Sequence, residues 1–229
     1  MCPTGPLIDL TLSNEENALV NSEISLSFNH HPVPKLAEVL TTNSTNQKLS
    51  ENQFNTIVAE LKLNITELDS VGSPMFNFYK SFKTKGIYDL PKLLVLAAML
   101  GIGSTAERVA VLFPLLPGLE EGMATPASLD WLVEQVLSVA AKSLPQLSVA
   151  EQAVRGVSLS AEEFEAYSTR LVANLPLAQP AATRLILKDR KRVSSQDLVS
   201  ALDGWGPLGK LLQPLEARRF LLRDEFSPK

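Results

Sequence analysis

Few side chains in this sequence have the types and spacing that catalysis or metal binding requires. The soft metal ligands are a single cysteine, Cys2, and the adjacent histidines His30 and His31. Zinc sites need three or four ligands, and two adjacent residues face in different directions, so we expect the histidines to be a surface pair. Without a second cysteine there is no internal disulfide, and we interpret Cys2 as an unmodified residue.

The motifs of nucleophilic catalysis and of phosphate binding are absent from the sequence. It has no G-x-S-x-G and no GK[ST] phosphate loop, and Gly101-Ile102-Gly103 lacks the remaining glycine and the strand of a dinucleotide fingerprint. The acid pairs Glu120-Glu121 and Glu162-Glu163 are typical of loop and helix-surface positions. We therefore expect a protein that is not an enzyme and holds no cofactor. An enzyme whose site the sequence hides is the least favoured alternative.

The composition is that of a globular, soluble protein, with 45% hydrophobic and 20% charged residues among 229. The net charge of −4 argues against nucleic-acid binding, which usually requires a basic excess. The longest apolar run, residues 90–102, contains Lys92 and is too short for a transmembrane segment. No basic-then-apolar leader begins the chain. We expect a cytoplasmic or other reducing compartment, and peripheral association with an organelle or the cytoskeleton fits as well.

Helices are the elements that would position any site. Over residues 75–113 the pattern predicts a helix, a short loop, a second helix, a brief break and a third helix. Phe76, Tyr79 and Phe82 share one face of the first helix. Gly86 provides the turn residue of the loop.

Capping residues predict where several helices begin. Ser50 is a candidate N-cap, and the pairs Ser104 with Glu107 and Ser160 with Glu163 have the capping-box spacing. The stretch that follows Ser160 is a clear amphipathic helix, and we expect Pro176 and Pro180 to separate it from a further helix that starts near residue 181.

The helix–loop–helix over residues 75–100 resembles an EF-hand, and the order of the units resembles the four-hand proteins related to calcineurin B and the neuronal calcium sensors. In the twelve-residue EF-hand loop, position six is glycine, position eight is apolar and position twelve is a carboxylate. Gly86 at position six puts Tyr88 at position eight. The ligand positions are then Ser81, Lys83, Lys85 and Lys92. Ammonium groups at these positions would repel calcium.

Three further segments fit the same frame. Residues 42–53 place Leu49 at position eight, and their ligand positions are neutral. Residues 117–128 keep a glycine at position six but begin with a proline. Residues 186–197 place Val193 at position eight and have a lysine in place of the glycine. No loop keeps the acidic signature, so the resemblance implies EF-hand units that do not bind calcium.

From this resemblance we predict an all-α fold of paired EF-hand-like units in two lobes with an extended N-terminal arm. The expected divisions are an extended arm at 1–34, an EF-hand-like pair at 35–115, a second pair with an insertion at 116–204, and a helical tail at 205–229.

Two candidate binding surfaces follow from these expectations. Paired EF-hands open an apolar groove in which an amphipathic partner helix lies. Aromatic and aliphatic residues at such positions are more often core than interface, and the residues expected to line the groove are Phe54, Phe76, Tyr79, Phe82, Leu93, Leu96, Met99 and Phe113. The second surface is a basic run that could contact an acidic partner, although such a run is more often a solvated loop. Its cations are Lys188, Arg190, Lys191 and Arg192.

The sequence therefore favours a non-catalytic, calcium-independent EF-hand-like structural or adaptor subunit of a larger protein assembly. It would bind protein subunits through the groove and through the N-terminal arm. The alternative is a regulatory calcium-sensor-like protein with weak or residual cation binding.

Overall fold

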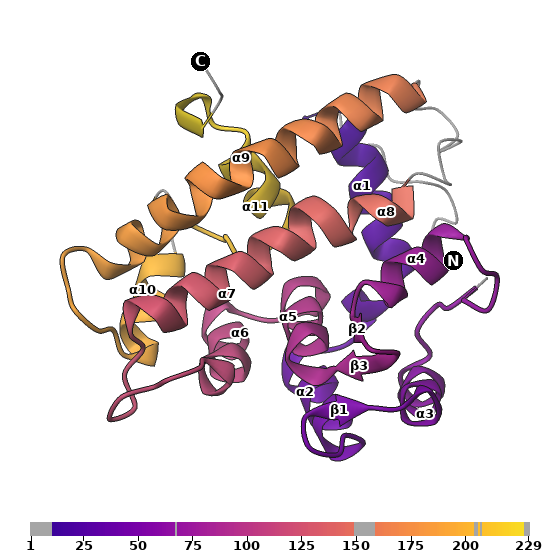
Figure 1. Cartoon of the computed structure of the whole chain (residues 1–229), viewed down its shortest axis with the longest axis horizontal. Coiled ribbons are helices and arrows are strands. Elements are labelled where there is room, and N and C mark those ends of the chain that lie inside the picture. The colour runs from indigo at the N-terminus through magenta and orange to yellow at the C-terminus, as the bar shows by residue number, and fades with distance from the viewer. Residues whose placement is uncertain (1–10, 67, 149–158, 204–205, 207, 227–229) are drawn as a thin grey trace.

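The computed structural model describes residues 11–66, 68–148, 159–203, 206 and 208–226, and these form a mainly helical fold with one small sheet. Cys2 and the first ten residues of the expected arm lie outside the described residues. Figure 1 shows the arrangement.

The first half of the chain contains short helices and the sheet. Its elements are α1 (Asn14–Ser25), η1 (Phe28–His30), α2 (Val33–Thr42), β1 (Lys48–Leu49), α3 (Glu51–Leu61), α4 (Pro74–Lys80), β2 (Lys83–Thr84), β3 (Ile87–Asp89), α5 (Leu90–Leu100), α6 (Thr105–Leu112) and η2 (Phe113–Leu115). The strands pair antiparallel in the order β1-β3-β2.

The second half contains the two longest helices. Its elements are α7 (Pro126–Ser138), a π-helical turn η3 (Val139–Ser143), α8 (Pro145–Ser148), α9 (Ala161–Leu187), α10 (Ser195–Leu202), α11 (Pro214–Leu221) and η4 (Asp224–Phe226). In Figure 1, α7 and α9 lie along each other, and α2, α3, α5 and α6 lie on the other side of α7, whereas α1 lies near α8 and one end of α9.

The helix starts confirm the capping predictions. The side chains of Ser50, Ser104 and Ser160 are N-caps of α3, α6 and α9, and each forms a reciprocal capping box with the residue three positions later. Such a box satisfies two backbone N–H groups that have no partner inside the helix.

The prediction of an extended arm over residues 1–34 is wrong for the part that the structure describes. Residues 14–25 form α1, which begins with a capping box between Ser13 and Glu16 and packs against α8 and α9. Helix α1 buries few apolar residues, and ion pairs hold it in place against α11. Glu16 and Glu23 pair with Arg219 and Arg218 of α11. Apolar periodicity in the sequence does not reveal a helix that is held mainly by polar contacts.

The predicted break at Pro176 and Pro180 is also wrong, because both prolines lie inside the continuous helix α9. They are one turn apart on the exposed side, whereas Leu171 and Ala178 on the opposite side are fully buried. The carbonyl groups that lose their hydrogen bonds to the prolines therefore face water, and burial of the other face against α7 holds the helix together.

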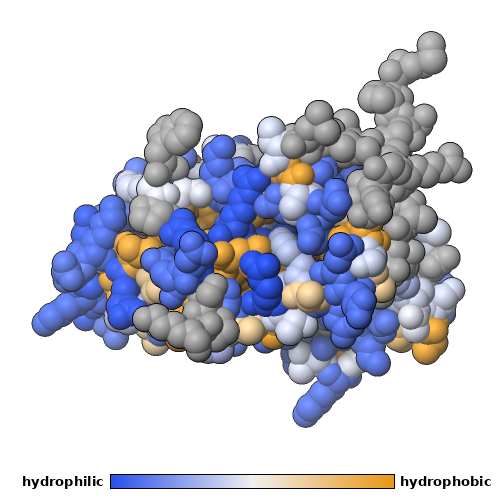
Figure 2. Space-filling view, turned by 90° about the horizontal axis from the view of Figure 1, so that it is seen from above, coloured by the Kyte–Doolittle hydropathy of each residue, from blue (hydrophilic) through white to orange (hydrophobic). Residues whose placement is uncertain are grey.

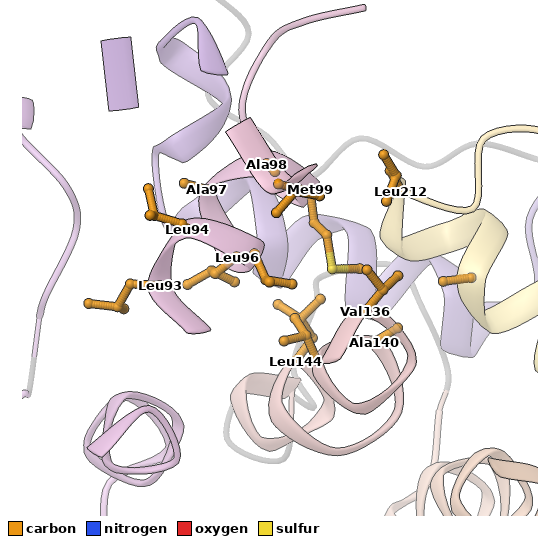
Figure 3. Close-up of a cluster of buried hydrophobic side chains, with 14 of the residues drawn as sticks. Leu93, Leu94, Leu96, Ala97, Ala98, Met99, Val136, Ala140, Leu144 and Leu212 are labelled. Carbon is orange, nitrogen blue, oxygen red and sulfur yellow. The ribbon is translucent and has the colours of Figure 1, made fainter. Parts of the chain in front are cut away.

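The two expected lobes share one core. Buried side chains from both halves form a single hydrophobic cluster, and α5 packs directly on α7. Figure 3 shows Met99 of α5 reaching toward Val136 and Leu144 from α7 and the turn that follows it. The two halves of the described chain thus pack around one common hydrophobic core.

A buried arginine fixes the end of α5 in this core. Arg108 of α6 is 8% exposed, and its guanidinium donates to the carbonyl oxygens of Met99 at 3.1 Å, Gly101 at 2.9 Å and Gly103 at 3.3 Å, and also to that of Ala98. The last carbonyls of a helix have no partner inside it, so one cation satisfies them here.

Candidate functional site

The four helix-connecting segments that fit the EF-hand frame are called here loop 1 (residues 42–53), loop 2 (81–92), loop 3 (117–128) and loop 4 (186–197). Loops 1 and 2 meet at position eight, where Leu49 lies opposite Tyr88 in the β1–β3 pair. Loops 3 and 4 also meet at position eight. Ala124 and Val193 exchange two backbone hydrogen bonds of 2.8 and 3.0 Å. The chain therefore joins its loops in two pairs by the same register.

The residue at position nine begins the following helix in every loop. The side chains of Ser50, Asp89, Thr125 and Ser194 accept from a backbone N–H of the first turn of α3, α5, α7 and α10. A single local rule, an N-cap directly after the paired residue, thus fixes the direction in which each helix leaves its loop.

The backbones of loops 1, 2 and 3 fold into tight hairpin turns. Positions five and six both have positive φ in each of them: Asn46 and Gln47, Lys85 and Gly86, Glu121 and Gly122. Positions four and seven are antiparallel bridge partners in all three. This is the pattern of a two-residue type I′ turn. Loop 4 differs, with positive φ at Lys188 and Asp189 directly after α9.

In loops 1, 3 and 4 the side chain at position twelve bonds to a residue of its own loop. In loop 1, Gln53 Nε2 donates to Thr45 Oγ1 at 3.2 Å. In loop 3, Ser128 Oγ donates to the carbonyl oxygen of Pro117 at 2.7 Å. In loop 4, Arg190 pairs with Asp197. These contacts join position twelve to the start or middle of the same loop, where a cation would otherwise join them.

Loop 2 is closed by charge pairing of a different kind. Lys83 Nζ lies 2.6 Å from Glu51 Oε2 of α3 and 4.4 Å from the ring centroid of Tyr88. Among its other predicted ligand positions, Ser81 Oγ donates to the carbonyl oxygen of Phe78 at 2.7 Å, Lys85 is exposed at the turn, and Lys92 lies in the first turn of α5. Within the described residues no group of three or more His, Cys, Asp or Glu side chains could hold a metal ion.

The predicted partner groove is not open in this structure. Seven of its eight residues are buried in the core: Phe54, Tyr79, Phe82, Leu93, Leu96, Met99 and Phe113. Phe76 is the exception and is half-buried. The space that a partner helix would enter is filled, because α5 packs on α2, α6 and α7.

A different apolar hollow exists between η3 and α8 on one side and the first half of α9 on the other. This α8–α9 groove has a volume of about 730 Å³. Its apolar lining residues are Ala141, Pro145, Ala161, Phe164, Val172 and Ala173. Lys142 and Glu165 line its opposite sides, and the buried hydroxyl of Ser168 has no hydrogen-bond partner among the described residues. Figure 2 looks onto the α9 side of the molecule, where hydrophobic patches lie among hydrophilic residues.

The basic run is largely engaged inside the protein. Arg190 pairs with Asp197, and Arg192 reaches loop 3, where its guanidinium lies 2.7 Å from Glu120 and 3.5 Å from Glu121. Lys188 and Lys191 are exposed. The run therefore helps to join loops 3 and 4, and two of its four cations remain available at the surface.

The histidines are not together in a site. His30 is exposed, whereas His31 Nε2 donates to the carbonyl oxygen of Leu61 at 2.6 Å, which ties the start of α2 to the end of α3. No described helix is long and apolar enough to cross a membrane.

Comparison with family models, with curated proteins and with solved structures finds no match to this chain. The loop register and the grooves are therefore the observations from which a function is inferred.

Proposed function

We propose that this protein is a non-catalytic, calcium-independent adaptor or structural subunit of a larger assembly, built from degenerate EF-hand-like units. The observation that carries the proposal is the repeated loop register. Leu49 with Tyr88 and Ala124 with Val193 meet at position eight, as expected for paired EF-hand loops, and an N-cap follows each of them.

Calcium independence is supported by the charges and contacts of the loops. Calcium sites need several oxygen ligands with negative charge. Loop 2 offers Lys83 and Lys85 instead, and the residues at position twelve of loops 1, 3 and 4 are already bonded within their loops. A cation would have to break these contacts and would gain at most one carboxylate, Glu121, in loop 3 and one, Asp197, in loop 4.

The α8–α9 groove is the surface that we assign to the partner, an amphipathic helix of another protein. Its floor is apolar, and Val172 in its lining is 41% exposed. Lys142 and Glu165 on opposite sides select a helix with an acidic row toward η3 and a basic row toward α9. Ser168 can additionally bond one polar side chain of the partner.

Calcium titration of the purified chain by calorimetry, with a magnesium control, tests the first half of the proposal. We expect no saturable heat up to about millimolar calcium, whereas sensors of this class bind at roughly micromolar concentrations. Saturable micromolar binding would favour the calcium-sensor alternative. A variant with Ser81→Asp, Lys83→Asp, Lys85→Asp and Lys92→Glu restores the acidic pattern of loop 2 and should gain calcium binding. No gain would contradict the EF-hand frame.

Size-exclusion analysis of the tagged chain in extracts of its source cells tests the adaptor role. Wild type should elute within a larger assembly, and Val172→Glu, which places a charge in the groove, should elute as free protein. Leu177→Glu is the matched control, because Leu177 lies on the same helix, is 52% exposed and does not line the groove. Equal behaviour of the two variants contradicts the assigned surface.

A further inference from the structure

A second hollow, formed by α4, the β2–β3 hairpin and the start of α3, has features of a small-molecule site. Its volume is about 560 Å³. Tyr79, Tyr88 and Phe76 form an aromatic wall, and Lys80, Lys83 and Lys85 line the same hollow. The hollow thus combines ring faces with ammonium groups, all contributed by residues 76–88.

The Tyr79 hydroxyl is a buried donor without a partner. Tyr79 is 0% exposed, and its hydroxyl oxygen makes no hydrogen bond to any described residue. Burial raises the pKa of Tyr79 well above its usual value, so the hydroxyl keeps its proton. Native proteins seldom leave a buried hydroxyl unpaired, so an acceptor from outside the chain is the natural partner.

The charges around the hollow leave cations available. Lys83 is neutralised by Glu51, which also lies near Tyr88 and, after burial, is the next cause that raises the pKa of Tyr88. Lys80 and Lys85 are exposed and make no ion pair with a described residue. Asp69 is the one further carboxylate among the lining residues. Lys80 Nζ lies 5.7 Å from the ring centroid of Phe76, so the hollow is lined by two ammonium groups outside ion pairs and one such carboxylate.

We propose that this hollow binds the phosphate group of a small phosphomonoester, with Lys80, Lys85 and the Tyr79 hydroxyl as its donors. A phosphate offers three oxygens, whereas a planar carboxylate offers two, and the donors here come from two elements: Tyr79 and Lys80 from α4, and Lys85 from the hairpin turn. Phe76 and Leu68 provide an apolar surface for the organic part. The inference does not rest on the adaptor function, because it involves neither the α8–α9 groove nor calcium.

Titration of the full chain with phenyl phosphate, followed by amide NMR and calorimetry at constant ionic strength, tests the site. We expect saturable binding, with shifts centred on residues 76–88. Tyr79→Phe removes only the hydroxyl oxygen and should weaken binding roughly tenfold, which corresponds to one charge-assisted hydrogen bond. The same variant should be at least as stable as wild type, because its buried donor has been removed. Binding and stability therefore change in opposite directions, which a purely structural role would not produce.

Charge variants and lipid vesicles complete the test. Lys80→Gln with Lys85→Gln should abolish measurable binding, and Lys48→Gln, an exposed lysine of the neighbouring loop outside the hollow, should leave it unchanged. Binding to vesicles that contain phosphatidic acid, if lost in Tyr79→Phe, identifies a lipid head group as the source of the phosphate. Absence of saturable binding in every arm, or binding that Tyr79→Phe and the double lysine variant both leave intact, overturns the proposal and assigns only water to the hollow.

Discussion

Leu49 and Tyr88 lie opposite each other where β1 and β3 pair, and both side chains are fully buried. The ring of Tyr88 stacks on that of Phe54 with a centroid distance of 4.1 Å, so the loop contact is continuous with the aromatic core. The position that pairs two loops is therefore also a position that packs the first half of the protein.

Truncation of Tyr88 should be strongly destabilising. Tyr88→Ala removes the stacked ring and leaves a cavity, so we expect the free energy of unfolding to fall by about 3–5 kcal/mol. Ile87→Ala, at the adjacent residue that is 42% exposed, should change it by less than about 1 kcal/mol. Urea unfolding followed by circular dichroism gives both values. Equal losses would mean that position eight is not part of the core.

Removal of one partner of the buried pair Arg218 and Glu23 should lower the free energy of unfolding strongly. Arg218 is 0% exposed and Glu23 is 8% exposed. Arg218→Met leaves the Glu23 carboxylate buried without its cation, and should cost about 3–5 kcal/mol in urea unfolding. The double variant with Glu23→Leu should recover most of this loss. Arg219→Met, at a residue 42% exposed by side chain, should cost no more than about 1 kcal/mol.

Two glycines at the break between α5 and α6 should differ in their tolerance of a methyl group. A Cβ on Gly101 would lie 2.7 Å from Leu36 Cδ1 and 2.8 Å from the carbonyl oxygen of Ala97. Gly101→Ala should therefore lower the free energy of unfolding, measured by urea unfolding, by about 1–3 kcal/mol. Gly103, whose nearest contact would be 3.3 Å, should accept alanine at a smaller cost. The reverse order would show that α2 moves away from this break easily.

The Asp197 carboxylate should make stability depend on pH in the acid range. The backbone N–H of Ser194, then its hydroxyl, and then Arg190 lower the pKa of Asp197 below its usual 3.8. A lowered pKa means that the stabilisation is present above about pH 3.8 and is lost as the pH falls through the folded value. The stability difference between wild type and Asp197→Asn should therefore be present at pH 6 and vanish toward pH 2. A difference that stays the same from pH 6 to pH 2 would contradict this expectation.

Helix boundaries were predictable because their signals are local. The pairs Ser104 with Glu107 and Ser160 with Glu163 lie within one turn of sequence, and both form the expected capping boxes. The EF-hand frame placed Leu49 and Val193 at position eight of their segments, and in the structure each of them pairs with a residue of another loop.

Long-range packing was not predictable from these signals. Helix α9 continues through Pro176 and Pro180 because its other face is buried against α7, a fact that no local pattern contains. Two arginines are buried because of partners that no local pattern shows. Arg218 pairs with Glu23, 195 positions away, and Arg108 donates to the carbonyl oxygen of Gly101, directly after the preceding helix. Apolar periodicity marks both core and groove residues, so it could not show that Leu93 and Met99 lie inside.

The candidate sites were predictable only in part. The lysines of loop 2 are evident in the sequence, but the unpaired hydroxyl of Tyr79 becomes evident only when its neighbours in space are known. Likewise, Phe164 and Val172 form one face of a helix in the sequence, and only the structure places η3 and α8 opposite them.

The contact between Glu23 and Arg218 joins residues that are 195 positions apart. During synthesis on the ribosome α1 emerges before the helices that it contacts, α8, α9 and α11. The side of α1 that is buried in the folded protein therefore remains exposed, or is bound by a chaperone, until the ribosome has synthesised the chain beyond residue 218. We expect the core to be completed only after α11 has been translated, and a nascent chain that ends before α11 to be a target for cellular quality control.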